Sequence, residues 1–205
     1  MKYILPLMLI ATTAIAKIKL QTGDILLQPL NCWVCGLIEE EENTIYSHMG
    51  ITIVENQSIK ILEAWGSVQE SSLSDFLSKT QQGERIKVIR PKKSNLQNEN
   101  TLNEITDELR RNFEEDFQGK NYDRDFLWTN LDSNGQEKFY CAEFVAKFLN
   151  TYLINKVLPK KMHFKKNRNY WRRYFQGSIP DNQLGLSPAD FERSNLFEVI
   201  GELTP

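Results

Sequence analysis

The stretch that decides the fold is YSHMGITIVENQSIKILEAWG, residues 46–66. Two apolar, β-branched runs, 46–54 and 58–65, flank the short polar segment 55–57, and this pattern predicts a β-hairpin. Alternate residues of the two runs are apolar and form the expected buried face of the hairpin. They are Met49, Ile51, Ile53, Leu62 and Ala64.

The opposite face of this hairpin would carry His48 and Glu63. A two-residue loop at 55–56 would place the two side chains directly opposite, and one at 56–57 would place them diagonally. Either register leaves their Cβ atoms roughly 5–8 Å apart, within reach of an imidazole–carboxylate hydrogen bond. A three-residue loop would put them on opposite faces. Because a carboxylate in an apolar strand needs a partner, we expect the pair to form.

Patterns outside the hairpin predict an α+β fold with an antiparallel sheet packed against helices. No repeat, low-complexity tract or linker divides the chain, so we expect a single domain at 17–205. The expected elements are a strand at 25–27, a long loop at 29–44, a strand at 85–90, a helix from Thr101 to Gly119, a helix at about 139–156, a helix beginning at Ser187-Pro188, and a strand at 196–200.

The first sixteen residues have the pattern of a secretory signal peptide. A basic start at Met1-Lys2 precedes the apolar run 4–10 and the small-x-small site 14–16. We therefore expect cleavage near Ala16 and export to the periplasm or the extracellular space. No cysteine follows the site, so no lipid anchor is expected. Removing one lysine leaves 24 − 27 = −3 as the formal charge, which argues against nucleic acid as a partner.

Three cysteines are an odd number for an oxidising compartment. Cys32 and Cys35 lie close together in the sequence, where a redox motif, half of a zinc site, a disulfide and two packed thiols are all conceivable. The favoured interpretation is a local disulfide or two packed thiols, because the following Glu-rich segment does not resemble a thioredoxin helix. This leaves Cys141 as the thiol whose role needs an explanation.

Cys141 lies in the first turn of the helix expected at 139–156, on its apolar stripe. Backbone N–H groups and the helix dipole favour a thiolate at that position, and the same N–H groups can hold an oxyanion. A buried cysteine on such a stripe is more often only a small hydrophobic residue. Together with His48 as base and Glu63 as orienting group, however, Cys141 completes a nucleophile–base–carboxylate set.

The chain resembles a known family in five segments. They are YSHMGI (46–51), ILEAWG (61–66), GKNYD (119–123), FYCAEFV (139–145) and LSPADFERS (186–194). These segments are similar in order and spacing to those of the permuted papain-like amidases, the YiiX-like group, which are circularly permuted relatives of the NlpC-type cell-wall cysteine peptidases.

The resemblance implies a permuted papain-like fold and a catalytic set of Cys141, His48 and Glu63, with no metal and no organic cofactor. It also implies an amidase or endopeptidase that cleaves an amide bond in a peptide or acyl-amide substrate of the cell envelope through an acyl-cysteine. Ala142 stands where the family often has serine, which leaves the backbone donor intact. The segment with Cys32 and Cys35 has no counterpart in the family pattern.

Two other functions stay open at this level. The order His–polar–Cys also resembles lecithin–retinol acyltransferase-like enzymes, and a long apolar groove beside Cys141 would favour lipid acyl chains over peptide. A catalytically silent envelope-binding module is the third reading, although the intact set of residues speaks against it. The basic stretch Lys160–Arg173 is expected to be a solvated face, with peripheral contact to anionic membranes as the alternative.

Overall fold

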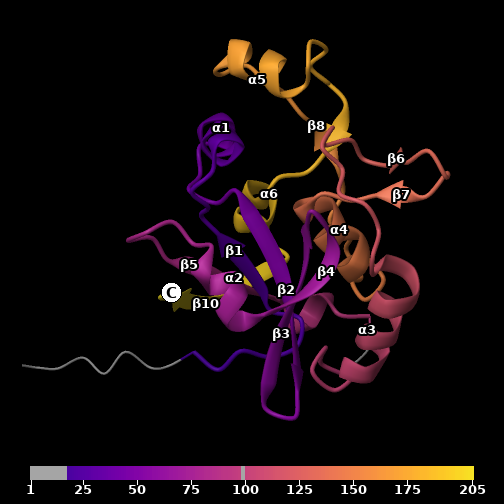
Figure 1. Ribbon diagram of the computed structural model, residues 1–205. Coiled ribbons are helices and arrows are strands. Elements are labelled where there is room, and N and C mark those ends of the chain that lie inside the picture. The colour runs from indigo at the N-terminus through magenta and orange to yellow at the C-terminus, as the bar shows by residue number, and fades with distance from the viewer. Residues whose placement is uncertain (1–17, 98–99) are drawn as a thin grey trace, which may run out of the picture.

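The computed structural model describes residues 18–97 and 100–205 (Figure 1). The expected signal peptide at 1–16 lies outside these residues. The centre of the molecule is a six-stranded antiparallel sheet, which confirms the predicted α+β class. Its strand order is β10-β5-β1-β2-β3-β4. The strands are β1 Ile25–Gln28, β2 His48–Glu55, β3 Ser58–Trp65, β4 Ser67–Ser72, β5 Ile86–Pro91 and β10 Phe197–Leu203.

The hairpin β2–β3 turns at Asn56 and Gln57, whose φ angles are 47° and 67°. Two successive residues with positive φ suit the twist of a two-residue hairpin loop. Glu55 pairs with Ser58 across the turn, and Gly50 therefore pairs with Glu63. His48 and Glu63 lie on one face in the diagonal arrangement, so the register with the loop at 56–57 is correct.

The helices cover both faces of the sheet and one of its ends. In Figure 1, α1 and α5 lie beyond the end of the sheet at which β2 begins, with α5 at the top of the view. None of the helices in the described residues is long and apolar enough to cross a membrane. The helices are α1 Trp33–Glu42, α2 Leu73–Ser78, α3 Thr106–Asn112, α4 Cys141–Asn150, α5 Arg168–Tyr174 and α6 Pro188–Glu192.

Short elements connect these helices. A 3-10 turn, η1, spans Lys93–Asn95, and a π-helical turn, η2, continues α3 over Phe113–Phe117. Two small antiparallel pairs complete the fold, and one of them joins the segments before and after α5. The pairs are β6 Asn130–Leu131 with β7 Glu137–Lys138, and β8 Lys160–Lys161 with β9 Leu184–Gly185.

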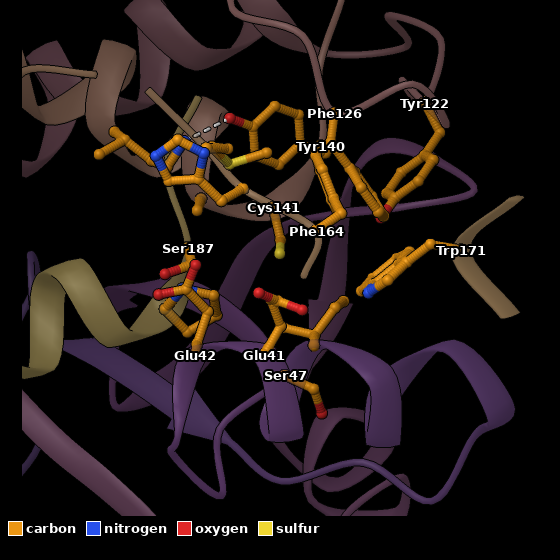
Figure 2. Close-up of a pocket in the computed structure, with 16 residues that line it drawn as sticks. Glu41, Glu42, Ser47, Tyr122, Phe126, Tyr140, Cys141, Phe164, Trp171 and Ser187 are labelled. Atoms are coloured by element: carbon orange, nitrogen blue, oxygen red, sulfur yellow. Dashed lines mark hydrogen bonds between the residues drawn. The ribbon is translucent and has the colours of Figure 1, made fainter. Parts of the chain in front are cut away.

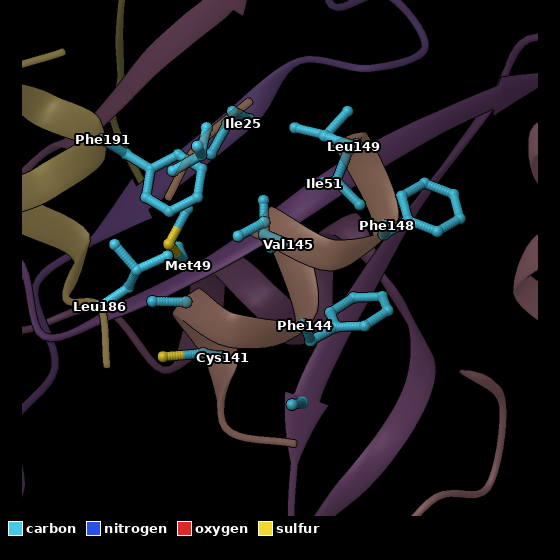
Figure 3. Packing of buried hydrophobic residues seen from close by; sticks show 14 of the residues in the cluster. Ile25, Met49, Ile51, Cys141, Phe144, Val145, Phe148, Leu149, Leu186 and Phe191 are labelled. Atoms are coloured by element: carbon cyan, nitrogen blue, oxygen red, sulfur yellow. The ribbon is translucent and has the colours of Figure 1, made fainter. Parts of the chain in front are cut away.

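The larger core lies between α4 and the sheet (Figure 3). Phe144, Val145 and Phe148 of α4 are fully buried together with Met49 and Ile51 of β2. Each such side chain contributes about 1.5–3 kcal/mol by leaving water. A second cluster on the other face places Phe76 of α2 against strands β1, β3 and β5. Packing from both sides fixes the start of α4 relative to the start of β2.

The prediction of a loop over 29–44 was wrong, because this segment contains α1. The Cys32 side chain accepts a hydrogen bond from the Cys35 N–H at the start of the helix. Asn43, with φ of 52°, ends it in the left-handed conformation that favours asparagine or glycine. With Gly36 and the acidic run 39–42, the segment has only a weak amphipathic pattern. Contacts with residues outside α1 stabilise the helix.

Two predicted helix boundaries were also displaced. The Glu104 carboxylate accepts hydrogen bonds from Thr101 N and Oγ1 at 2.6 and 2.9 Å, which is only half of the predicted capping box, and the regular helix begins at Thr106. The helix expected at 139–156 ends at Asn150. The Asn150 side chain donates to the carbonyl of Val157 and accepts from its N–H, and these bonds fold the chain back.

Candidate active site

The fold brings His48 and Glu63 into direct contact. His48 Nε2 lies 2.6 Å from Glu63 Oε2, and the two residues are 2 % and 0 % exposed. His48 is the first residue of β2, and Glu63 lies near the end of β3. The contact is the imidazole–carboxylate pair that the hairpin register predicts.

Two further groups hold the Glu63 carboxylate. Ser71 Oγ of β4 and Lys79 Nζ, which follows α2, donate hydrogen bonds to Oε1 at 2.5 and 2.6 Å. Burial alone would raise the pKa of Glu63, but the hydrogen bonds from His48, Lys79 and Ser71 lower it to about 2. The carboxylate is therefore ionised at neutral pH. Sequence reasoning missed Ser71 and Lys79 because it predicted neither β4 nor α2.

The surroundings of His48 favour the positively charged form of its imidazole. Burial would lower its pKa, but hydrogen bonds and charge interactions with Cys141 and Glu63 raise the pKa to about 9. Because Glu63 occupies Nε2, Nδ1 is the ring nitrogen left for the thiol. The rings of Trp65 and Phe76 lie 5.4 and 5.7 Å from the imidazole and fix its orientation.

Cys141 is the first residue of α4 and the free thiol of the chain. The preceding residue, Tyr140, makes no side-chain capping bond, so the N–H groups of the first turn keep their donor capacity. The positive end of the helix dipole points in the same direction and favours an anion at this place. Cys141 is 6 % exposed, and its sulfur reaches a pocket.

The pocket beside Cys141 is narrow, with a volume of about 50 Å³ (Figure 2). The loop segment 162–164 and α5 close it on one side and α1 closes it on another. Its apolar wall consists of Ile38, Phe126, Tyr140, Met162, Phe164, Trp171 and Leu186, and its polar groups come from Glu41, Glu42, Ser47, His163 and Ser187. Apart from Tyr140, which precedes Cys141 in the sequence, sequence reasoning did not place these residues next to Cys141.

Part of the basic stretch 160–173 docks on the acidic helix α1 rather than forming only a solvated face. The Glu41 carboxylate accepts hydrogen bonds from the backbone N–H groups of Lys165 and Lys166 at 2.9 and 2.7 Å. Lys160 Nζ lies 3.3 Å from Glu42 and 2.7 Å from Asp190. These contacts hold the two sides of the pocket together. The acidic run 39–42 and the basic stretch 160–173 carry opposite charges, and this was the signal in the sequence for the contact.

Other residues of the candidate motifs are structural. Cys32 and Cys35 form a disulfide at the start of α1, so they are not half of a zinc site. The Asp123 carboxylate, at the end of the GKNYD segment, accepts hydrogen bonds from the N–H groups of Asp125 and Leu127, which shapes the loop before α4. The described parts of the chain contain no group of three or more His, Cys, Asp or Glu side chains that could hold a metal ion.

Two known proteins are similar to this chain, one in sequence and one in structure. The uncharacterized protein YiiX of Escherichia coli K12 is 26 % identical over 137 residues, which are 67 % of this chain and 61 % of that protein. A crystal structure described as metalloprotein YiiX from Escherichia coli O157:H7 superposes with a TM-score of 0.74 at 21 % identity, covering 90 % of this chain and 98 % of that one. The fold is thus the permuted papain-like fold that the sequence resemblance implies.

The family comparison covers nearly the whole described chain. Residues 19–200 match the model of the permuted papain-like amidase enzymes YaeF/YiiX. The match includes β1, the hairpin with His48 and Glu63, and helix α4 with Cys141. The chain therefore belongs to the permuted papain-like amidases, the C92 family of cysteine peptidases and amidases.

Proposed function

We propose that this protein is an exported cysteine amidase or endopeptidase that cleaves an amide bond in cell-wall peptide. Cys141 is the nucleophile, His48 the acid–base group and Glu63 the carboxylate that orients the imidazole. The observation that carries the proposal is the buried pair at 2.6 Å between His48 and Glu63. The Glu63 carboxylate and the Cys141 sulfur, which lies at an uncapped helix start, together favour the charged form of the imidazole.

In the first half of the reaction, Cys141 gives its thiol proton to His48, and the sulfur attacks the amide carbonyl carbon and forms a tetrahedral intermediate. N–H groups of the first turn of α4 stabilise its oxyanion. The imidazolium of His48 then gives its proton to the nitrogen of the leaving amine as the C–N bond breaks. The amine departs, and the acyl group remains on sulfur as a thioester.

In the second half, the neutral imidazole accepts a proton from water, whose oxygen attacks the thioester carbonyl. The C–S bond breaks, and the carboxylic acid leaves. Glu63, held by Ser71 and Lys79, keeps the ring in place through both halves and stabilises its charged form. Because the carboxylate is buried and ionised, it performs this role without taking up the proton itself.

The narrow pocket supports a peptide substrate over a lipid. Its volume of about 50 Å³ has room for a small group, and Glu41 and Glu42 contribute polar atoms. The apolar wall with Phe164 and Trp171 is the observation that favours the second candidate, a lipid-directed cysteine acyl hydrolase or acyltransferase. That function would require the pocket to open between α1 and α5. Export rests on the signal-like sequence at 1–16.

The related E. coli structure is described as a metalloprotein. Structural and catalytic zinc sites in proteins use three or four side-chain ligands. In the part of this chain that the structure describes, no such group of His, Cys, Asp or Glu is gathered. Cys32 and Cys35 are joined to each other, and His48 is bonded to Glu63. The residues present do not fit a resident metal, and no step of the mechanism uses one.

The test incubates purified protein with peptidoglycan fragments and counts new amine and carboxyl ends. We expect cleavage by the wild type and by the surface variant Glu202→Gln, and none by Cys141→Ala. In parallel, iodoacetamide should alkylate Cys141 rapidly near neutral pH, and His48→Gln should slow this reaction. Fragments left intact by the wild type together with cleavage of phospholipid esters would favour the lipid enzyme. A Cys141 that reacts like an ordinary thiol in both proteins would indicate a silent binding module.

A further inference from the structure

Trp171 carries a buried donor that has no partner. The residue is 1 % exposed, and its Nε1 atom makes no hydrogen bond. Among the described side chains, the other buried polar atoms without a partner are the oxygens Gln28 Oε1 and Glu143 Oε2. Because burying an N–H group without an acceptor is unfavourable, such a group in a pocket points to an acceptor supplied by a ligand.

The Trp171 ring is held in this orientation from several sides. Phe164 meets it edge-on at 4.9 Å, Phe175 stacks on it at 5.7 Å, and Tyr174 lies at 90° to it at 6.0 Å. In Figure 2 the indole nitrogen points into the pocket that the Cys141 sulfur also enters. The donor therefore faces the space that a substrate group bound beside Cys141 would occupy.

We propose that Trp171 Nε1–H donates a hydrogen bond to a neutral carbonyl oxygen in the acyl part of the substrate, next to the bond that Cys141 attacks. This inference rests on the proposed amidase function and narrows its substrate to acyl groups that contain an amide, as in a peptide. Glu41 and Glu42 line the same pocket and repel a carboxylate or a phosphate. A purely aliphatic acyl chain would fill the space but leave the indole N–H unpaired.

The activity test compares two p-nitrophenyl esters of similar shape, the N-acetylglycyl ester and the pentanoyl ester, which has methylenes in place of the amide. Trp171→Phe removes the N–H and keeps an aromatic ring in the wall. We expect its kcat/KM for the N-acetylglycyl ester to fall about tenfold, while that for the pentanoyl ester stays within about twofold, as the loss of one hydrogen bond predicts. Trp33→Phe, a change at an exposed tryptophan outside the pocket, should alter neither value.

An equal fall for both esters would show that Trp171 only supports the wall, and no fall for either would show that its donor is not used. Both results overturn the inference. If the wild type cleaves neither ester, or if Cys141→Ala is as active as the wild type, the proposed function fails instead. If the wild type cleaves the esters through Cys141 but Trp171→Phe keeps the same ratio of kcat/KM for the two esters, the proposed function stands. Only the inference about Trp171 is then wrong.

A binding measurement tests the contact without turnover. The chain has four tryptophans, and the indole resonance of Trp171 is assigned by its loss in Trp171→Phe. In Cys141→Ala protein, N-acetylglycinamide should move this resonance downfield, and pentanamide should not. A resonance that already has a hydrogen-bonded shift in the free protein and does not move would mean that water or Glu41 satisfies the donor, which overturns the proposal.

Discussion

The substitution Glu63→Gln separates the charge of the carboxylate from its packing. Glutamine fills the same buried space and can still accept from Ser71, but it no longer stabilises a positive imidazole. The pKa of His48 is raised from 6.5 to about 9 although burial opposes this. At 1.36 kcal/mol per pH unit, the rise corresponds to roughly 3 kcal/mol in favour of the charged ring. Glu63 and Cys141 share this effect.

Loss of a neighbouring carboxylate lowers the pKa of a partner by about 1–3 units. We therefore expect the His48 pKa of Glu63→Gln to fall from about 9 towards neutrality. The chain contains two histidines, so two ring-carbon signals in an NMR titration report this directly, with His163 as the internal reference. The alkaline limb of Cys141 alkylation by iodoacetamide should move to lower pH in parallel.

The interaction of His48 with Glu63 also makes the stability of the fold depend on pH. A pKa that is raised in the folded state stabilises the fold below 6.5, and this contribution is lost as pH rises through about 9. Urea unfolding of the wild type at pH 6 and pH 9.5 should show this loss, and Glu63→Gln should show less of it. A wild-type His48 that titrates near 6.5, or an unchanged midpoint in Glu63→Gln, would refute the electrostatic reasoning.

Three further predictions concern stability. Burial raises the pKa of Glu143 to about 7, so the unfolding free energy should fall by roughly 3 kcal/mol as pH rises from 4.5 to 7. Urea titrations of Glu143→Gln should show a weaker dependence on pH. The same dependence in wild type and variant would contradict this prediction. Arg90 pairs with the fully buried Asp24 at 2.6 Å; Arg90→Leu should therefore cost about 3–5 kcal/mol of unfolding free energy, whereas a cost below about 1 kcal/mol would show that Asp24 is protonated or solvated instead. The Cys32–Cys35 disulfide closes a short loop; its reduction should cost only about 2 kcal/mol by chemical denaturation, and global unfolding on reduction would disprove this.

The sequence alone determined the local geometry of the candidate site. The alternating apolar pattern placed His48 and Glu63 on one face for either two-residue loop, since side chains alternate strictly along a strand, and the structure then selected the loop at 56–57. The apolar stripe of α4 put Cys141 in the first turn, because helical periodicity is also local. Both patterns follow from bond geometry over a few residues, so no knowledge of distant contacts was needed.

Only the tertiary structure decided the surroundings of these three residues. Ser71 and Lys79 reach Glu63 from β4 and α2, two short elements without a strong periodic pattern. The pocket wall joins α1 to α5 across more than a hundred residues of sequence, through Glu41 and the backbone N–H groups of Lys165 and Lys166. Helix α1 itself has little amphipathic pattern, and contacts of this kind stabilise it. Such pairings depend on how the whole chain folds back on itself, which local propensity does not encode.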